Sequence, residues 1–415
     1  MSGGSGGGKA RQGRLAINRL RLRLARLTAA GEPVGDTIDR FFARHEFPIV
    51  EGVRVTFAVR VDVAEGVWLR HRVVGLPGDL RLRRVPGTDL WYVVVEIPPD
   101  SRVEYQFERR IPSSRGVDGG SSPLTDDDGR WERFNDPANP RVARSPVGDS
   151  SICFSEGYRV PDWALFDPDA RPGELVEWTV PSQAQRRDNR VTVYLPARYS
   201  PNARYPLLIV HDGGDFLEYA AMKTVLDNLI HRLDMAATVV AFTYPGERLT
   251  EYPNSAAHAR WITGELLPEL EQRLSLAGQP AGRALMGSSF GAVASLSVAR
   301  RYPETFGSLL LQSGSFVFTD IGADHGEGPS FDPVVKFMNR YRERPVRVAD
   351  RLFISCGVYE DLIVSNRSML PVFTDTGMEV NYVESRDGHN WESWRDRLRD
   401  GLSWIFPGEQ LFVYE

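Results

Sequence analysis

Short runs of alternating apolar and polar residues dominate the chain between residues 53 and 110. Four such runs are separated by turns rich in glycine, proline and serine, and each is typical of a β-strand with one buried face; they lie at residues 53–61, 67–74, 90–97 and 102–110. No helical pattern separates the four runs. The pattern therefore predicts a small β-sandwich domain over residues 36–112.

The pattern changes after residue 165, where nearly continuous apolar runs alternate with helix-like segments. Strands are predicted at residues 175–180, 191–195, 206–211, 237–242, 283–287, 308–314, 351–357 and 379–385. Helices are predicted at residues 221–233, 256–274, 292–302, 362–376 and 391–405. Strands that are apolar on both faces are typical of a parallel sheet covered by helices on both sides. Residues 166–415 are therefore predicted to form a doubly wound, mostly parallel α/β domain.

Two polar segments flank the predicted β-sandwich. Residues 1–35 begin with a glycine-serine tract and carry seven Lys or Arg residues before the first acid, Glu32, so we interpret them as a basic, low-complexity arm. Arginines interrupt the leucines of this arm, which argues against a signal peptide and favours a surface helix or a disordered arm; an interfacial helix on a polyanion is the alternative. Residues 113–165 are rich in Gly, Ser, Pro and Asp and are predicted to be a linker.

Composition narrows the class of protein. The 415 residues suggest two or three domains, and a net charge of −5 argues against broad nucleic-acid binding. No apolar run reaches the roughly 18 residues of a membrane span. The two cysteines, Cys153 and Cys356, form neither a disulfide framework nor a cysteine zinc site, so a reducing, cytoplasmic setting is expected.

One motif in the α/β segment carries chemistry. Residues 287–291 fit the pattern G-x-S-x-G, between a predicted strand and a predicted helix, which is the context of a nucleophile elbow. In such a turn the central serine, Ser289, presents its hydroxyl at the start of the helix. Ser288 lies one residue earlier and is expected to point away.

A serine nucleophile needs a histidine base and an acid that orients the histidine. In this kind of fold the acid follows the serine in the sequence, and the histidine follows the acid. Only His325 and His389 follow Ser289, and His389 comes directly after a predicted strand, where catalytic groups of α/β folds gather. The predicted strand at 351–357 is followed by Glu360 and Asp361. Either carboxylate could orient the histidine. We favour Glu360, with Asp361 as the alternative acid or as a helix N-cap.

An oxyanion hole needs backbone N–H donors. We expect one from Phe290, directly after the nucleophile, and one from Gly213 or Gly214, in the loop after the strand at 206–211. His211 and Asp212 are interpreted as structural. His, Cys and carboxylate residues do not cluster at metal-ligand spacing, so no protein-bound metal or cofactor is predicted.

Several motifs together resemble a known family. They are DGGDF (212–216), R-x-x-E-Y (248–252), ELLPEL (265–270), MGSSFGA (286–292), RYPETFG (301–307), QSGSF (312–316) and DGHNW (387–391). In this order they resemble the esterase D and enterochelin esterase group of α/β-hydrolases, over about residues 174–406. Residues 39–60, 87–98 and 135–141 are similar to the Ig-like N-terminal domain and linker of enterochelin (ferric enterobactin) esterases.

The resemblance implies an α/β hydrolase preceded by a small Ig-like domain, with Ser289, Glu360 and His389 as triad. It also implies that Arg248 and Glu251 lie near the substrate pocket; an i, i+3 ion pair between these two is the alternative. Members of the family are cytoplasmic enzymes that hydrolyse the trilactone of catecholate siderophores so that iron is released. For this chain we expect the reaction to pass through an acyl-serine intermediate at Ser289. The implied partner is thus a small-molecule ester, with iron present only as part of the substrate.

Two other functions stay open at this point. A feruloyl, carbohydrate or other acyl esterase would share the same catalytic fold. A binding protein with an inactive hydrolase fold is the third possibility, against which the complete set of serine, acid, histidine and glycines argues. The sequence makes no prediction of the oligomeric state.

Overall fold

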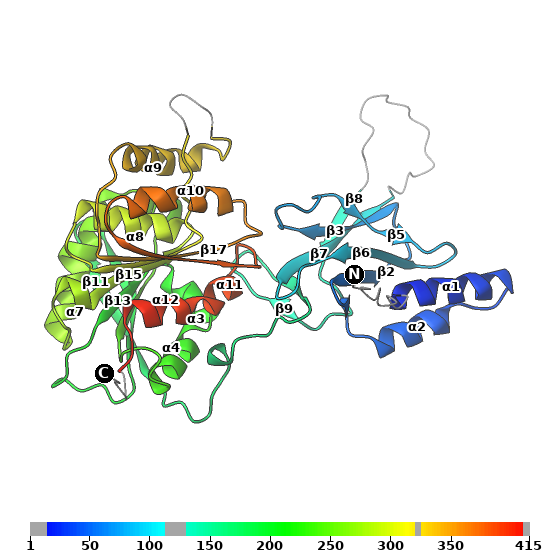
Figure 1. The fold of residues 1–415 in the computed structure, drawn as a ribbon, viewed down its shortest axis with the longest axis horizontal. Coiled ribbons are helices and arrows are strands. Elements are labelled where there is room, and N and C mark those ends of the chain that lie inside the picture. The colour runs from blue at the N-terminus through cyan, green and yellow to red at the C-terminus, as the bar shows by residue number, and fades with distance from the viewer. Residues whose placement is uncertain (1–14, 113–129, 320–324, 410–415) are drawn as a thin grey trace, which may run out of the picture. The chain divides into compact units, whose positions relative to one another are not determined.

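The computed structural model describes residues 15–112, 130–319 and 325–409, which form two compact units (Figure 1). Of the described residues, the first unit comprises 15–72, 76–112, 130–143 and 149–158. The second comprises 73–75, 144–148, 159–319 and 325–409.

Two antiparallel β-sheets build the N-terminal unit. One has the order β1-β2-β6-β5, and the other has the order β4-β3-β7-β10-β9 with β8 paired to β7. The strands are β1 (Ile49–Glu51), β2 (Arg54–Arg60), β3 (Gly66–His71), β4 (Leu80–Arg81), β5 (Arg83–Arg84), β6 (Leu90–Glu96), β7 (Arg102–Ile111), β8 (Arg130–Phe134), β9 (Val142–Ala143) and β10 (Ser150–Phe154). The rings of Phe57 and Tyr105, one from each sheet, meet edge to face with centroids 4.8 Å apart. The four predicted strands are present as β2, β3, β6 and β7.

The prediction of a linker over residues 113–165 is wrong for its described central part. Strands β8 to β10 lie in this segment, and β10 pairs antiparallel with β7. Its polar residues are buried because they bond to one another: Tyr105 donates to Asp136 at 2.6 Å, and Asn139 donates to the Tyr105 hydroxyl and to the carbonyl of Ile152. The composition of this segment is typical of a loop. Its polar side chains are nevertheless buried in the fold, because hydrogen bonds satisfy them there. Residues 113–129 lie outside the described part of the chain.

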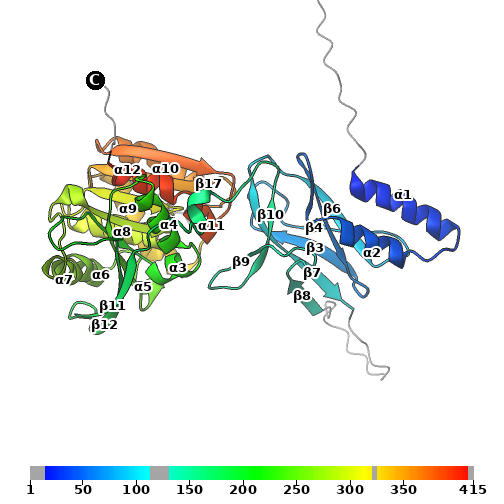
Figure 2. The ribbon, with the colours of Figure 1, turned by 90° about the horizontal axis from the view of Figure 1, so that it is seen from below.

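The predicted basic arm, residues 1–35, is in part a folded helix. Helix α1 (Ala16–Ala29) and helix α2 (Gly35–Arg44) pack beside the sheet that contains β6 (Figure 2). Ile17, Leu20 and Leu24 are buried in the same core as Ile38 of α2 and Tyr92 of β6. The apolar side of α1 is therefore buried inside the unit, while its arginines are exposed, and the Arg21 guanidinium lies 5.1 Å from the centre of the Tyr92 ring. Residues 1–14 lie outside the described residues.

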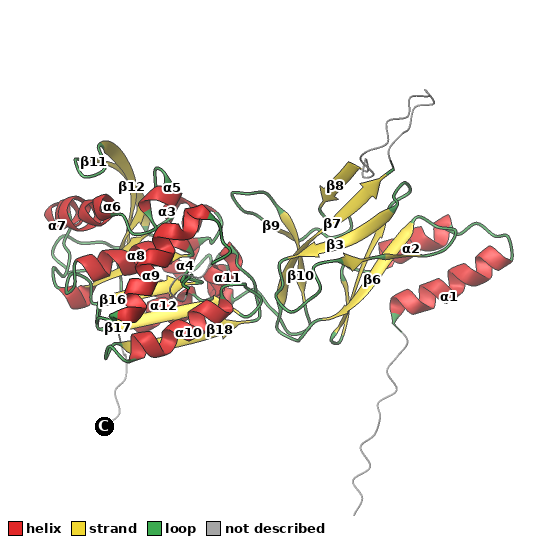
Figure 3. Ribbon diagram, turned by 90° about the horizontal axis from the view of Figure 1, so that it is seen from above, coloured by secondary structure: helices red, strands yellow, loops and turns green. Residues whose placement is uncertain are grey.

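The second unit contains an eight-stranded sheet with the order β11-β12-β14-β13-β15-β16-β17-β18. From β14 onward neighbouring strands run parallel, whereas β11 and β12 form an antiparallel hairpin at the opposite edge from β18 (Figure 3). All eight predicted strands are present: β11 (Glu174–Ser182), β12 (Arg187–Leu195), β13 (Leu207–Val210), β14 (Val239–Thr243), β15 (Arg283–Ser288), β16 (Ser308–Gln312), β17 (Arg351–Gly357) and β18 (Glu379–Ser385).

Helices cover both faces of this sheet, and two hydrophobic cores result. Leu207 and Ile209 of β13 belong to one core, and Leu208 and Val210 belong to the other, because successive side chains of a strand point to opposite faces. Helices α6 to α10 close the first core, and α3, α4, α11 and α12 close the second. The helices are α3 (Gly213–Glu218), α4 (Met222–His231), α5 (Arg248–Glu251), α6 (Ala256–Arg260), α7 (Leu267–Arg273), α8 (Phe290–Arg301), α9 (Asp332–Glu343), α10 (Ile363–Thr374), α11 (Trp391–Asp396) and α12 (Leu398–Ile405).

The predicted helices match these elements with small changes. The helix predicted at 256–274 consists of α6, a π-helical turn (Trp261–Leu266) and α7, and the one predicted at 391–405 is divided into α11 and α12. Helices α3, α5 and α9 were not predicted. Because β13 and β15 to β18 are parallel, the loops after them meet at one edge of the sheet, where ligands bind in such folds.

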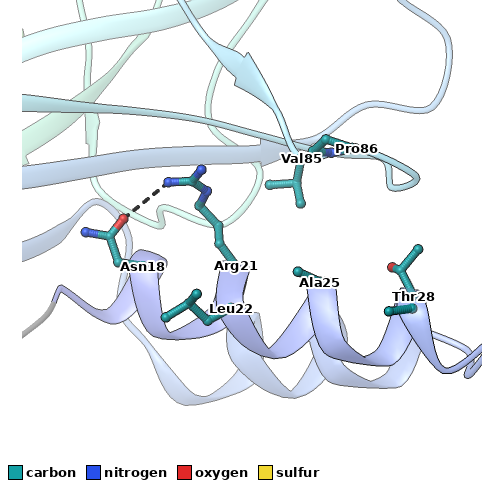
Figure 4. Close-up of a pocket in the computed structure, with 8 residues that line it drawn as sticks. Asn18, Arg21, Leu22, Ala25, Thr28, Val85 and Pro86 are labelled. Carbon is teal, nitrogen blue, oxygen red and sulfur yellow. Dashed lines mark hydrogen bonds between the residues drawn. The ribbon is translucent and has the colours of Figure 1, made fainter.

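Three further features concern membrane spans, the two cysteines and a cavity. In the described ranges, no helix combines the length and the hydropathy that crossing a membrane requires. Cys153 and Cys356 are both buried and unpaired. A cavity of about 680 Å³ lies beside α1 in the N-terminal unit, lined by side chains that include Arg21 and Val85 (Figure 4). None of the candidate site residues lines it.

Helix α1 offers a test of its role in the N-terminal core. Leu24 is 1% exposed, so Leu24→Ala should lower the free energy of unfolding of this unit by about 2–5 kcal/mol through lost burial and a cavity. The control Leu22→Ala removes an exposed leucine of the same helix and should cost less than about 0.5 kcal/mol. Guanidinium chloride denaturation followed by circular dichroism measures both; equal effects would show that α1 is not anchored by this face.

Candidate active site

The turn between β15 and α8 has the geometry of a nucleophile elbow. Ser289 has φ 57° and ψ −121°, a backbone conformation that a non-glycine residue adopts only when its surroundings enforce it. Gly287 is required because a Cβ there would overlap the backbone of Gly291. The two glycines thus let the strand and the helix approach closely enough for this strained turn.

The neighbouring serine points into the protein, as predicted. Ser288 is 1% exposed, and its hydroxyl lies 3.4 Å from the Gln312 side-chain oxygen. Ser289 is only half-buried, and its N–H donates to the Gln312 carbonyl at 2.9 Å. The elbow therefore presents the Ser289 hydroxyl and hides that of Ser288.

The predicted acid and base lie together. His389 Nδ1 is 2.8 Å from Glu360 Oε2, and the Glu360 carboxylate is completely buried. The other oxygen, Oε1, accepts hydrogen bonds from the Ser313 hydroxyl at 2.6 Å and from the Gly357 N–H at 2.8 Å. Asp361 is exposed and is not the N-cap either, because α10 is capped by Leu362 without a side-chain hydrogen bond. Of the two candidate acids, only Glu360 contacts the histidine.

The predicted nucleophile, Ser289, has a partner other than the predicted base in this structure. The Ser289 hydroxyl oxygen is 3.2 Å from that of Ser315, and among the described residues no hydrogen bond joins it to His389. Hydrogen bonds between nucleophile and base are often long in enzymes without substrate and tighten in the complex. The predicted pair thus shares the sheet edge without the bond itself.

The predicted oxyanion donors lie at the starts of two helices. Phe290 is the first residue of α8, and Gly213 and Gly214 are the first residues of α3; such N–H groups have no acceptor within the helix. A Cβ on Gly213 would overlap the backbone of Phe242, and one on Gly214 would overlap the ring of Tyr244. Both glycines are therefore required by packing against β14 and the residue that follows it, whatever they donate to.

Comparison with known proteins agrees with this arrangement. Residues 182–405 match the family described as "Putative esterase", which is more than half of the chain, and residues 54–163 match "Enterochelin esterase, N-terminal". The chain belongs to this esterase family. The resemblance seen in the sequence motifs is confirmed, and the protein is a carboxylic ester hydrolase by family.

Curated relatives match most of this esterase. The iron(III) enterobactin esterase of Dickeya dadantii is 25% identical over 358 residues, which is 79% of each chain. The iron(III) enterobactin esterase of Escherichia coli K12 is 23% identical over 337 residues, 77% of this chain and 80% of the relative.

Solved structures share the fold of this esterase. The enterobactin esterase of Shigella flexneri, crystallised in the presence of enterobactin, superposes with a TM-score of 0.69 at 20% identity and covers 88% of this chain and 97% of its own. A ferulic acid esterase reaches a TM-score of 0.50 at 19% identity but covers only 57% of this chain. Of these two structures, the enterobactin esterase covers the larger share of this chain.

Arg248 and Glu251 of the esterase do not pair with each other, so that alternative is wrong. Arg248 binds both carboxylate oxygens of Asp212 through Nε and Nη2, at 2.8–3.0 Å, and its guanidinium also lies over the Phe290 ring. Glu251 instead pairs with Arg187 at 3.0 Å. Asp212 has φ 53° and directly precedes Gly213, so Arg248 links the two segments that carry the predicted oxyanion donors.

His211 and His258 form a buried pair below this loop. Their Nε2 atoms are 2.9 Å apart, and His211 Nδ1 lies 3.1 Å from the carbonyl of Met286. The same Nδ1 lies 3.0 Å from the Ser295 hydroxyl, whose own proton goes to the Gly291 carbonyl. Both neighbours of Nδ1 thus accept, so His211 carries its proton on Nδ1 and accepts from His258 at Nε2. Burial lowers the pKa of His211 to about 4 and lowers that of His258 as well, so both are neutral at physiological pH. The structural interpretation of His211 agrees with this.

The other histidine that follows Ser289 has a separate partner. His325 Nε2 is 2.9 Å from the carboxylate of Asp332 at the start of α9. Sequence reasoning missed Ser313, Ser315 and Trp394, which contact Glu360, Ser289 and His389 respectively. The QSGSF motif contained both serines, but a local pattern cannot tell which residues their hydroxyls meet.

The Arg248–Asp212 pair offers a test of the loop. Asp212 is 3% exposed, so Arg248→Ala would leave a buried carboxylate without its cation and should lower the free energy of unfolding by about 3 kcal/mol. The control Arg347→Ala breaks an exposed pair with Asp350 and should cost less than about 1 kcal/mol. Urea denaturation compares the variants; similar losses for both would contradict the structural importance of this pair.

Asp215 predicts a pH-dependent stability. Burial, and to a smaller extent the charge of Asp212, raises the pKa of Asp215 to about 6. The folded state then holds a proton that the unfolded state has lost, so stability falls as the pH rises from about 4 to about 6. Asp215→Asn should therefore be more stable by about 1 kcal/mol at pH 7, after discounting for solvent, and equal at pH 4.

Denaturant unfolding at a series of pH values checks this expectation. Asp169→Asn, which changes an exposed carboxylate, is the matched control. A difference between Asp215→Asn and the unmodified protein that does not vary with pH would refute it.

Proposed function

We propose that this esterase is a serine hydrolase that cleaves the ester bonds of a catecholate siderophore, an enterobactin-like trilactone, and thereby releases iron. The observation that carries the proposal is the hydrogen bond between His389 and the buried carboxylate of Glu360, at the sheet edge where the elbow presents Ser289. A serine hydroxyl is a weak nucleophile, and an oriented histidine is what activates it.

In the first half of the proposed reaction, Ser289 Oγ attacks the ester carbonyl carbon and its proton passes to His389 Nε2. Glu360 orients the imidazole through Nδ1 and stabilises its charged form. The N–H of Phe290 and that of Gly213 or Gly214 receive the developing oxyanion. The bond to the leaving alcohol then breaks, the alcohol takes the proton from His389, and an acyl-serine remains.

In the second half, water gives a proton to His389 and attacks the acyl carbon. The bond to Ser289 Oγ breaks, the proton returns to that oxygen, and the acid product leaves. Each ester consumes one water molecule, and no electrons are transferred, so the residues need no bound cofactor for this step. Iron takes part only as the cargo of the substrate.

The choice of substrate rests on the extent of the similarity. The relatives named iron(III) enterobactin esterases match 77–79% of the chain, including the N-terminal unit. A feruloyl or other carbohydrate ester, the alternative substrate, would be supported through the α/β unit alone. The proposal therefore favours the siderophore ester, and the complete catalytic set argues against an inactive binding protein.

The proposal also covers the fold of the N-terminal unit, the cellular location and the roles of Arg248 and Glu251. The N-terminal unit is proposed to be an Ig-like sandwich, supported by its two antiparallel sheets joined through Phe57 and Tyr105. A cytoplasmic location is supported by the buried, unpaired cysteines. Arg248 is proposed to contact substrate from its place over Phe290, whereas Glu251, held by Arg187, organises the loop.

Purified protein, incubated with ferric enterobactin and with its iron-free form, should produce linear trimers and smaller fragments on chromatography. Ser289→Ala should reduce turnover by about 10⁴-fold or more and abolish labelling by a fluorophosphonate probe. Ser288→Ala, the matched control, should retain both. Cleavage of short acyl esters without any enterobactin product would reject the substrate, and absence of label on Ser289 in the unmodified protein would reject the serine mechanism.

A further inference from the structure

The segment that follows β16 lies between the nucleophile and the acid. In the sheet, β16 is the neighbour of β15, which leads to Ser289, and of β17, which leads to Glu360. All three strands run parallel, so their following loops leave the same edge side by side. The residues after β16 are Ser313, Gly314 and Ser315.

Ser313 holds the acid. Its hydroxyl is 2.6 Å from Glu360 Oε1, and both residues are at least 98% buried. Trp394 Nε1 donates to the same hydroxyl oxygen at 2.9 Å. An indole N–H can only donate, so the single proton of the Ser313 hydroxyl is left for the carboxylate. Trp394 also places its ring edge to face against His389, with centroids 5.0 Å apart.

Ser315 meets the nucleophile from the other side of Gly314. Its hydroxyl oxygen is 3.2 Å from Ser289 Oγ, and its N–H donates to the carbonyl of Ser289 at 3.2 Å. Ser315 is 2% exposed, so protein rather than water surrounds its hydroxyl. A proton donated by Ser315 to Ser289 Oγ would leave the nucleophile's own proton for the base.

Hydrogen bonds fix the segment to β17 and to α10. The N–H of Ser313 donates to the carbonyl of Ser355 in β17, and Ser313 itself has φ 45°. The Asn366 side chain of α10 donates to the carbonyl of Gly314 at 2.9 Å. Three consecutive residues are thus held in place, with one hydroxyl directed to each side.

We propose that Ser313 and Ser315 are positioning residues of the triad: Ser313, oriented by Trp394, fixes the carboxylate of Glu360, and Ser315 fixes the hydroxyl of Ser289. The inference rests on the proposed serine mechanism and deepens it. It makes the strand between nucleophile and acid the element that sets their spacing.

The first experiment measures the rate constant for labelling of Ser289 by a fluorophosphonate probe. Ser313→Ala removes a hydrogen bond to a charged group and should slow labelling by about 10- to 100-fold. Trp394→Phe keeps a ring beside His389 but removes the donor, and should slow it by about 3- to 10-fold. In a Glu360→Gln background, Ser313→Ala should add less than about a twofold loss, because Ser313 acts through the carboxylate.

The second experiment addresses Ser315 with p-nitrophenyl acetate. Ser315→Ala should lower kcat by about 3- to 10-fold and leave KM within about twofold, because only the orientation of the nucleophile changes. Ser315→Thr, which retains the hydroxyl, should recover most of the loss. An increase in kcat for Ser315→Ala would show instead that Ser315 restrains the nucleophile, and would overturn its assigned role.

A matched control separates these effects from loss of structure. Ser308 is buried at the opposite end of β16, and Ser308→Ala should label within about twofold of the unmodified rate. Full additivity of Ser313→Ala and Glu360→Gln, or unchanged labelling of Ser313→Ala, overturns the inference while leaving the serine mechanism in place. Failure of the unmodified protein to label at Ser289 rejects the proposed function itself.

Discussion

The parallel run of β15, β16, β17 and β18 is the constraint on which the site depends. Parallel strands release their following loops at one edge, so residues 289, 313–315, 360 and 389 gather there although a hundred positions separate the first from the last. The loops can be short, because each begins at the carboxyl end of its own strand, directly beside the site. The helices on both faces of the sheet pack against the apolar side chains of these strands and hold the strands in place.

Burial and charge are balanced differently at the two polar centres of this edge. Three hydrogen-bond donors surround Glu360, so its charge is stabilised by oriented groups that also fix its direction. Asp212 is instead neutralised by Arg248 in a two-point ion pair. The first arrangement leaves the carboxylate able to act on His389. The second holds a strained loop in shape.

The N-terminal unit illustrates how polar sequence can be structural. Asp136 and Asn139 lie in a stretch whose composition is typical of a loop, yet their bonds to Tyr105 and to the backbone of β10 bury them beside a sheet. Helix α1 makes the same point for a basic segment, since Ile17, Leu20 and Leu24 enter the core while its arginines are exposed. Composition alone therefore predicted a linker and an arm in segments where the structure has strands β8 to β10 and helix α1.

Much of the architecture was determined by the sequence alone, because apolar runs and glycine-marked turns are local signals. All eight strands of the α/β sheet, the elbow at Ser289 and the position of His389 after the last strand follow from such signals. The choice between Glu360 and Asp361 was decided only in three dimensions, because adjacent side chains point in different directions and only the fold shows which one meets the histidine. The partners of Arg248, and the contacts of Ser313 and Ser315, likewise join residues distant in sequence, and a local pattern does not contain such contacts.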